Sequence, residues 1–309
     1  GFCILNALIP ICSSYLRAFG FSKEPLYASI IGNVINFCLN AFFLFVLHKG
    51  VAGVATATVV SRIINLVIVV LLGAVLVKAK QHPERESNRE VMGQIIRIGL
   101  PSACETAIYN VSMTLVIRFL NQMDAQGLNV TARSYTMQIT NFSYCVGAAL
   151  AQANAIMTGW HIGAKEHDAC DRGTKKAAVI GVIVAVILET VFTLCSGWIM
   201  QLFSKDPQMV SLVGKLLAID IVLEIGRVTP LVYGQALKTS GDAVFPVVMG
   251  ACFMILCSVG GTYLFGIRLG LLAVGAYIGM AGDECVRAIG MYLRWKSGKW
   301  KEKGLVKSR

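Results

Sequence analysis

Long runs of apolar residues, separated by short polar links, fill most of this sequence. Eight of nine such runs are long enough to cross the hydrocarbon core of a bilayer, about 30 Å thick, as α-helices. The composition agrees, since 56% of the residues are hydrophobic and 15% are charged, whereas a soluble domain has about 25% charged residues. We therefore predict an all-α polytopic membrane protein. The nine predicted segments are 1–16, 26–47, 51–77, 95–120, 128–160, 177–203, 209–237, 244–265 and 271–295.

Basic residues are distributed unevenly among the links. One set of links, together with the C-terminal tail, holds seventeen Lys and Arg residues, and the other set holds three, which are Lys49, Lys205 and Arg268. Cytoplasmic links of membrane proteins carry such an excess, so we place the rich set and the C-terminus in the cytoplasm. The net charge of +11 then needs no nucleic-acid partner. Trp295 and Trp300, beside the tail lysines, are interpreted as anchors at the membrane interface.

One pattern occurs twice: Leu, a basic residue, two further residues, Gly, four further residues and Pro. The copies lie at 16–25 and 237–246. Each is followed by an apolar run and then by small residues, GVAGVA at 50–55 and GLLAVG at 270–275. Six segments separate the copies, so both face the same side of the membrane. This favours a parallel repeat of two six-helix lobes, related by an axis along the membrane normal.

The repeat sets the expected domain boundaries. Residues 1–77 would form the C-terminal half of the first lobe, with three helices of which the first is cut short, and residues 95–295 a complete second lobe. The polar segment 78–94 is the predicted cytoplasmic linker between the lobes, and 296–309 a basic cytoplasmic tail. We expect about three further helices upstream, so that nine of about twelve are present, and we expect these 309 residues alone not to transport.

Glu105 is a candidate site residue because of its depth. It lies ten residues into its segment (105 − 95), about 15 Å deep and so near the midplane, and no basic residue stands three or four positions away. Pro101, one turn earlier, loosens the helix. Ionisable residues at such depth are functional by default, which indicates a site for a cation such as Na⁺, a proton or a cationic substrate. The alternative is a carboxyl group kept neutral by burial and hydrogen-bonded to a neighbouring helix.

Asp220, Glu224 and Arg227 are spaced by four and then three residues, which puts them on one helical face. Arg227 would neutralise Glu224, so a structural ion pair and a functional site are equally open. Asp220 leaves a net negative charge on that face. Pro230 should bend the helix, since it cannot donate to the carbonyl one turn back. In the last segment, two acids followed by a base at 283–287 favour structural pairing.

Two polar stripes recur at helical spacing within apolar segments. They are interpreted either as the lining of a cavity or as hydrogen bonds between helices. Arg62 is expected to have a carboxylate partner in another helix, whereas Glu189 is isolated and nothing near it indicates a site. The sequence shows no nucleophile–base pair, phosphate loop or metal-ligand cluster, so we predict no enzymatic activity. The stripes consist of Asn33, Asn36 and Asn40 in one segment and Tyr135, Gln138, Asn141 and Tyr144 in another.

With these residues placed, the chain resembles the multidrug and toxic compound extrusion (MATE) family, from the end of that family's fourth helix through its twelfth. The stretch IGLPSACE at 98–105 is similar to the start of the family's seventh helix. EIGR at 224–227, with LKTSGD at 237–242, is similar to its tenth helix and the following loop, and DECVR at 283–287 resembles the bacterial form of its last helix. The order and spacing of these pieces together carry the resemblance.

The resemblance implies a multi-pass antiporter of the bacterial inner membrane that exports small organic cations and drugs in exchange for Na⁺ or H⁺. Transport would proceed by alternating access through a cavity between the lobes, with no cofactor beyond the coupling ion, and we expect a monomer. By position, Glu105 is the best-supported functional acid, followed by Glu224 and Arg227. Ile225 and Pro230 are less typical of the family's tenth helix. The family's first helix, which often supplies an acid, has no counterpart here.

The alternative within the same superfamily is a flippase for lipid-linked saccharides or lipids. A flippase cavity should be richer in basic residues, because these hold phosphate. The charged residues expected near the midplane include acids from three segments, with Arg62 and Arg227 as the basic exceptions, and this favours cations.

Overall fold

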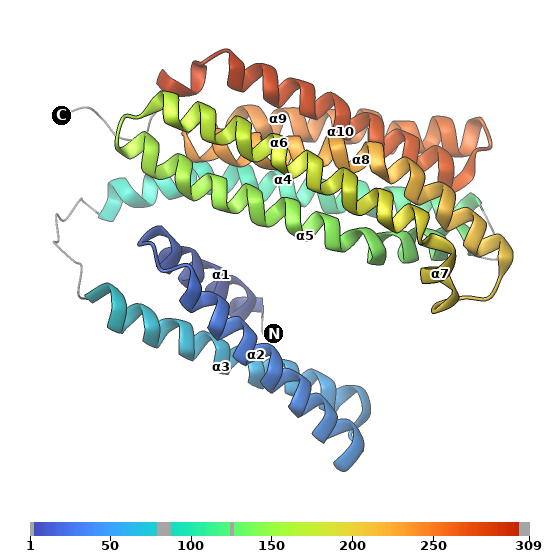
Figure 1. Cartoon of the computed structure of the whole chain (residues 1–309), viewed down its shortest axis with the longest axis horizontal. Coiled ribbons are helices and arrows are strands. Elements are labelled where there is room, and N and C mark those ends of the chain that lie inside the picture. The colour runs from blue at the N-terminus through green and yellow to red at the C-terminus, as the bar shows by residue number, and fades with distance from the viewer. Residues whose placement is uncertain (1–2, 79–87, 124–126, 303–309) are drawn as a thin grey trace. The chain divides into compact units, whose positions relative to one another are not determined.

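A computed structural model describes residues 3–78, 88–123 and 127–302, and every regular element in them is helical (Figure 1). This confirms the predicted all-α class. The chain divides into two compact units, Gly1–Glu86 and Ser87–Arg309. The first unit contains α1 (Cys3–Ala18), α2 (Lys23–Ala41), the π-helix η1 (Phe42–Val46) and α3 (Gly50–Lys78). The second contains α4 (Asn88–Met123), α5 (Leu128–Gly163), α6 (His167–Leu194), α7 (Ser196–Gln201), α8 (Pro207–Thr239), α9 (Val244–Phe253), the π-helices η2 (Met254–Val259) and η3 (Thr262–Arg268), α10 (Leu272–Lys296) and the 3₁₀ turn η4 (Lys299–Glu302).

In the first unit, α3 packs against both α1 and α2. The buried apolar side chains of this unit are few and include Leu16, Ala28 and Val69. Gly32 of α2 lies against Asn65 of α3, where a Cβ atom would come within 3.1 Å of the asparagine side chain. The small residue therefore lets two helices approach around a polar side chain, as is common between helices in membranes.

The second unit is an elongated bundle in which α8 packs against α5, α6 and α10 (Figure 1). The helices α4 and α8 continue through Pro101 and Pro230. A large apolar cluster joins α4, α5, α8 and α10, and includes Val116, Leu216 and Tyr277. Because α8 touches most of the other helices, its acids Asp220 and Glu224 are enclosed by protein.

Within the residues that the structure describes, four helices are long and apolar enough to cross a membrane by length and composition: Lys23–Val46, Gly50–Val77, His167–Leu194 and Val244–Arg268. The helices α4, α5, α8 and α10, with 25 to 36 residues, are also long enough but carry more polar residues. Many of these residues are buried within the second unit, which is the usual position of charge in a membrane-embedded helix. The buried charged residues of α8 and α10 are Asp220, Glu224, Asp283, Glu284 and Arg287.

Two helices, α4 and α6, begin at least seven residues before the predicted starts of their apolar runs. The helix α6 begins at His167 and not at residue 177, because the basic link is itself helical and Lys175 pairs with Asp171 one turn before it, with Nζ and Oδ2 2.6 Å apart. The helix α4 begins at Asn88, inside the expected linker 78–94, of which residues 79–87 lie outside the described part. An apolar run thus marks the membrane-embedded part of a helix and not its end.

The two tryptophans near the C-terminus are buried, which corrects their interpretation as interfacial anchors. The rings of Trp295 and Trp300 stack with centroids 4.2 Å apart, and both residues are buried. Trp295 Nε1 donates to Asp171 Oδ1 at 2.8 Å, and Trp300 Nε1 donates to the carbonyl of Trp295 at 3.1 Å. The indole N–H groups have protein partners, so these rings fasten the end of α10 to α6.

The backbone repeats the turn that the sequence predicts to occur twice. Gly20 and Gly241 adopt φ angles of +90° and +92°. In both copies the amide after the glycine donates to the carbonyl of the pattern's leucine, Leu16 or Leu237, at 3.0 and 2.9 Å. This is the Schellman arrangement that ends a helix, and its left-handed residue favours glycine. The next helices, α2 and α9, begin at the third position after the glycine in both copies.

The two copies shift by one position before the following turn. Gly53 lies against Phe43, where an added Cβ would come within 2.9 Å of the phenylalanine Cβ, and Gly275 lies closer still to the backbone of Phe265, where an added Cβ would be 2.6 Å from the carbonyl oxygen. Counted from Gly241, Phe265 and Gly275 each come one position later than Phe43 and Gly53 do when counted from Gly20. The π-helix Met254–Val259 accounts for the shift, because its α-helical counterpart in α2 has no such turn, and a π-turn holds one extra residue within a helix.

The close approach at Gly275 predicts a large effect of a single methyl group. Gly275→Ala should destabilise the protein by about 1–3 kcal/mol, since the new Cβ collides with backbone that cannot rotate away. Gly282→Ala, in the same helix but with nothing within 4 Å of the added Cβ, should be neutral or mildly stabilising. Thermal denaturation in detergent, followed by size-exclusion chromatography, measures both. Equal melting temperatures for the two variants would contradict the prediction.

Candidate functional site

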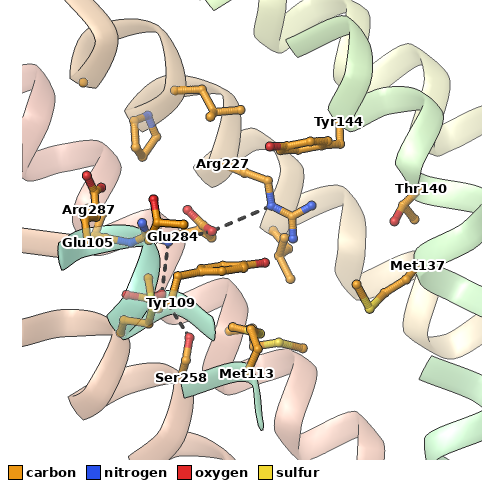
Figure 2. Close-up of a pocket in the computed structure, with 18 of the residues that line it drawn as sticks. Glu105, Tyr109, Met113, Met137, Thr140, Tyr144, Arg227, Ser258, Glu284 and Arg287 are labelled. Atoms are coloured by element: carbon orange, nitrogen blue, oxygen red, sulfur yellow. Dashed lines mark hydrogen bonds and ion pairs between the residues drawn. The ribbon is translucent and has the colours of Figure 1, made fainter. Parts of the chain in front are cut away.

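A cavity of about 590 Å³ opens inside the second unit, between α4, α5, α8, α10 and the α9–η2 segment (Figure 2). This volume is in the range of small-molecule sites, about 300–1,000 Å³. Its lining mixes aromatic rings, methionines and charged side chains from helices far apart in sequence. The acidic residues are Glu105, Asp220, Asp283 and Glu284, and the basic residues are Arg133, Arg227, Lys238 and Arg287.

Glu105 forms an ion pair across two helices with Lys238, the penultimate residue of α8, with Oε2 and Nζ 2.6 Å apart. Both side chains are about one-fifth exposed. Gly250 of α9 leaves room for the carboxylate, since a Cβ there would lie 3.2 Å from Glu105 Oε1. Gly250 is six residues into α9, about 9 Å along it. The carboxylate therefore lies beside the second turn of α9.

Glu224 and Arg227 pair with each other, as their spacing suggests, through Oε1 and Nη1. Glu224 is fully buried and does not line the cavity, whereas Arg227 does. Arg227 Nε also lies 3.7 Å from Glu284 Oε1 of α10. The two helices come this close because Gly226 faces α10, where a Cβ would meet the amide nitrogen of Cys285 at 2.8 Å.

The acids of α10 are paired within their own helix, as expected. Arg287 Nη2 lies 2.6 Å from Glu284 Oε1 and 3.2 Å from Asp283 Oδ2. Ser258 Oγ of η2 donates to Asp283 Oδ2 at 2.9 Å. Together with Arg227, these residues form a continuous chain of ion pairs from α8 to α10, part of which is drawn in Figure 2. Buried charges in such a network destabilise the fold less than isolated buried ions would.

Two acids in this region lack an ion-pair partner in the described part of the chain. Asp220 lines the cavity, is 2% exposed, and its Oδ2 accepts no hydrogen bond. Glu189 of α6 is fully buried behind α8, and neither of its carboxylate oxygens has a hydrogen-bond partner. Its charge interacts with those of Asp220 and Glu224, and Ser143 lies close by without a hydrogen bond. The sequence did not indicate a site at Glu189, because these neighbours belong to other helices and are distant in the chain.

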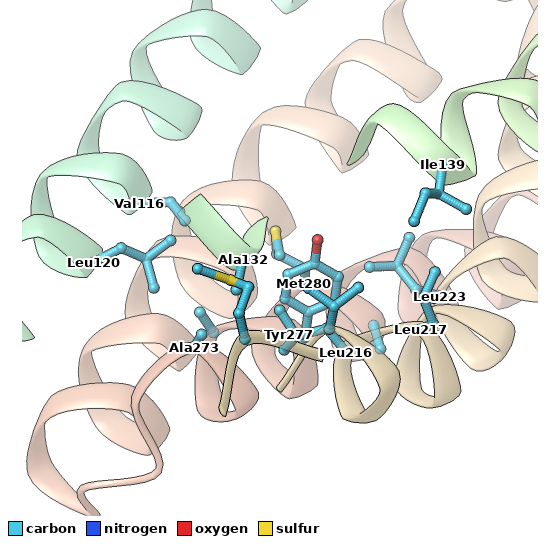
Figure 3. Packing of buried hydrophobic residues seen from close by; sticks show 14 of the residues in the cluster. Val116, Leu120, Ala132, Ile139, Leu216, Leu217, Leu223, Ala273, Tyr277 and Met280 are labelled. Atoms are coloured by element: carbon cyan, nitrogen blue, oxygen red, sulfur yellow. The ribbon is translucent and has the colours of Figure 1, made fainter. Parts of the chain in front are cut away.

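Arg133 of α5 was also missed from the sequence. It lines the cavity and is 6% exposed. Its one described hydrogen bond runs from Nη2 to Met113 Sδ at 3.6 Å, and its Nε has no partner. The available signal was a basic residue inside an apolar run with no acid one turn away. Figure 3 shows neighbouring Ala132 and Tyr277 in the apolar cluster next to the cavity.

The polar stripe of α5 divides into two parts. Asn141 and Tyr144 line the cavity. Tyr135 instead packs against Phe203, with ring centroids 5.5 Å apart, and Gln138 is exposed. Of the candidate residues in the second unit, the structure therefore gathers Glu105, Asp220 and Arg227 around this cavity. It leaves Glu224, Tyr135 and Gln138 outside it.

In the first unit, the asparagine stripe makes one hydrogen bond between helices and one within α2. Asn36 Nδ2 of α2 donates to Ser61 Oγ of α3 at 3.0 Å, and Asn40 Nδ2 donates to Asn36 Oδ1 at 3.1 Å. Asn33 is exposed. Arg62 is also exposed and forms no ion pair with the residues that the structure describes. The interpretation as hydrogen bonds between helices thus holds for Asn36, whereas the described bond of Asn40 lies within α2.

The fold and the cavity together define a polytopic α-helical membrane protein with an internal polar site, the class to which transporters belong. A family model described as MatE matches residues 101–264. The chain is 33% identical to the uncharacterized transporter YisQ of Bacillus subtilis, over 99% of this chain and 68% of that protein. It is 22% identical to the probable multidrug resistance protein NorM of Thermotoga maritima, over 97% of this chain and 65% of that protein. The chain belongs to the MATE family of transporters.

Solved structures share the fold. The crystal structure of MATE in the straight conformation superposes with a TM-score of 0.81 at 20% identity, covering 93% of this chain and 65% of that chain. A MOP superfamily transporter from Pyrococcus furiosus gives a TM-score of 0.82 at 20% identity, with the same coverage. The chain therefore spans about two thirds of the length of these two relatives and two solved structures.

The ion pairs on α8 predict unequal effects of removing their two members. Arg227→Met leaves the fully buried Glu224 without a cation and should cost about 3–5 kcal/mol of stability. Glu224→Gln should cost less, because Arg227 keeps Glu284. Thermal denaturation of the purified variants measures the order.

Lys215→Met removes an exposed positive charge from the same helix and serves as the control, with a small expected change. The double variant Glu224→Gln, Arg227→Met should be more stable than Arg227→Met alone, since it removes the stranded carboxylate. If Glu224→Gln proves the most damaging change, Glu224 has a partner other than Arg227.

Proposed function

We propose that the protein is a secondary active antiporter that exports small organic cations and drugs in exchange for Na⁺ or H⁺ by alternating access. We place it in the bacterial inner membrane as a multi-pass monomer with a cytoplasmic C-terminus. The observation that carries this proposal is the charged cavity inside the second unit, in a chain of the MATE family. The names of relatives support export of drugs, since two curated bacterial relatives are described as probable multidrug resistance proteins.

The ion pair at the edge of the cavity suggests how two fluxes can be coupled. Lys238 places an ammonium group on Glu105, where a substrate cation or a coupling ion would also bind. An arriving cation must displace Lys238, and a departing one lets Lys238 return. Competition for one carboxylate couples the movements of two cations without direct contact between them. Lys238 thus serves as the internal occupant of the site between cycles.

A flippase for lipids or lipid-linked saccharides is the second candidate. The observation in its favour is that four basic residues line the cavity beside four acids, more than the sequence indicated. The Pyrococcus furiosus transporter is described as having a binding pocket of reverse polarity that suggests a different function for that protein. Most of the basic residues here are neutralised by ion pairs with acids, which favours the export of cations.

Efflux of ethidium from an efflux-deficient bacterium, expressing the protein as its gene encodes it, tests the proposal. We expect energy-dependent efflux. Repeating the assay at fixed pH with and without a Na⁺ gradient identifies the coupling ion, since one carboxylate serves either cation. Good expression without efflux of any cationic dye would count heavily against export of organic cations and would favour the flippase.

Glu105→Gln should abolish coupled efflux while the folded protein remains in the membrane. The substitution keeps the volume and the hydrogen-bonding capacity of the side chain but removes its charge. The matched control is Glu166→Gln, at an exposed acid on the link before α6, which should transport normally. Dye efflux and the amount of protein in the membrane are measured together. Normal transport by Glu105→Gln would return Glu105 to a structural role.

A further inference from the structure

Glu189 of α6 is an acid to which the proposed mechanism gives no role. Its side chain is fully buried, and neither carboxylate oxygen has a hydrogen-bond partner. It forms no ion pair with the residues that the structure describes. The described lining of the cavity includes no residue of α6, so a molecule bound there does not contact this carboxyl group. An ionised Glu189 would therefore be a buried charge with nothing to compensate it.

The other buried acids nearby are better accommodated. Those of α8 and α10 either pair with an arginine or line the cavity, where water or a cation can reach them. A lone carboxylate in an apolar interior is strongly destabilising, and such a group binds a proton instead of remaining charged. Complete burial without a partner thus points to a neutral carboxylic acid at Glu189.

The packing of α6 against α8 fixes the height of Glu189 in the bundle. The two helices run antiparallel (Figure 1), and Gly181 lies against Val228, where an added Cβ would be 2.7 Å from the valine Cγ1. Glu189 comes eight residues after this contact on α6 (189 − 181), and Asp220 comes eight residues before it on α8 (228 − 220). At about 1.5 Å per residue, both lie about 12 Å from the contact. Glu189 is therefore level with the cavity but separated from it by α8.

The groups that face Glu189 supply no free counter-charge. From α5 comes the hydroxyl of Ser143, which is buried and also lacks a hydrogen-bond partner. From α8, the charges of Asp220, Glu224 and Arg227 act on it. These are two negative charges and one positive charge, and the positive charge is already shared by two other acids. The short helix α7, which also packs against this region, carries no titratable residue.

We propose that Glu189 is a proton-binding residue of the transport cycle, which holds a proton in this arrangement of the helices and releases it to water in an arrangement that hydrates the space behind α8. The inference rests on the proposed antiport and deepens it, because it assigns H⁺ as an exchanged ion and places its site outside the cavity. A protonated carboxyl group can both donate to and accept from the hydroxyl of Ser143. In the described part of the chain, no group of three or more His, Cys, Asp or Glu side chains could hold a metal ion, which favours a proton over Na⁺.

Infrared spectroscopy of the purified protein, expressed as its gene encodes it, tests the charge state without any transport. A protonated carboxyl group has a C=O stretch above the amide band, whereas a carboxylate does not absorb there. At neutral pH, Glu189→Gln should lose one such carbonyl band that the wild-type protein shows. Glu166→Gln, which removes an exposed acid, should retain it. An unchanged band in Glu189→Gln would show that Glu189 is ionised and would overturn the inference.

The folding of the variant is itself informative. Glu189→Gln replaces a neutral acid by a neutral amide of similar volume, so its melting temperature should equal or exceed that of the wild-type protein. If it cannot be purified, Glu189→Met, also uncharged and of similar length, takes its place. Failure of both variants to fold, while Glu166→Gln folds, would mean that the fold requires a negative charge at this position, which also overturns the inference.

Transport in proteoliposomes tests the role of the proton. Ethidium should still bind to purified Glu189→Gln, because Glu189 does not line the cavity. The same variant should lose the accumulation of ethidium that a pH gradient drives, whereas Glu166→Gln should accumulate the dye as the wild-type protein does. Retained binding with lost accumulation separates a missing proton site from a damaged substrate site.

The remaining outcomes separate the inference from the proposed function. Normal accumulation by Glu189→Gln, beside normal wild-type transport, would overturn the inference and leave the antiport in place. A wild-type protein that moves no cationic dye would overturn the proposed function, and the role of Glu189 in transport with it. Accumulation that is driven by a Na⁺ gradient and not by a pH gradient, and that is lost in Glu189→Gln, would assign the site to Na⁺ and overturn the proton.

Discussion

The pairing of buried charges along α8 is the constraint on which the second unit depends. Three of its charged residues, Glu224, Arg227 and Lys238, are held in ion pairs, because the surroundings are too apolar to hold these charges separately. Arg227 and Lys238 each reach an acid of another helix, Glu284 on α10 and Glu105 on α4. The packing of three helices is thus tied to the neutralisation of charge. Small residues such as Gly226 and Gly250 allow the approach that the pairs require.

The sequence predicted the helical class and the positions of the main helices because apolar periodicity and length are local properties. It also predicted the pairs formed within one helix, Glu224 with Arg227 and Asp283 with Arg287, since a spacing of three or four residues places such side chains together. The repeated turn was visible for the same reason, because glycine at a left-handed position leaves a local signature.

What the sequence could not predict are contacts between helices distant in the chain. Lys238 lies 133 residues from Glu105, and no spacing rule joins them. Glu189 looked isolated because its neighbours lie on α5 and α8. Trp295 and Trp300 looked interfacial because aromatic residues beside lysines are typical of that position, whereas their N–H groups donate to Asp171 of α6 and to the carbonyl of Trp295 at the end of α10. In each case the deciding partner comes from tertiary packing.

The unmatched π-turn at Met254–Val259 means that the two halves of the repeat cannot be interchanged. An inserted residue rotates everything after it by about 100° in a regular helix, yet Gly53 and Gly275 still occupy equivalent positions. The π-turn accommodates the inserted residue locally, so the structural difference between the two copies is confined to this one part of the cavity lining. That stretch carries Met254 and Ser258 into the cavity. The second copy thus presents a π-helical segment to the cavity, whereas the equivalent stretch of the first copy, in α2, is α-helical.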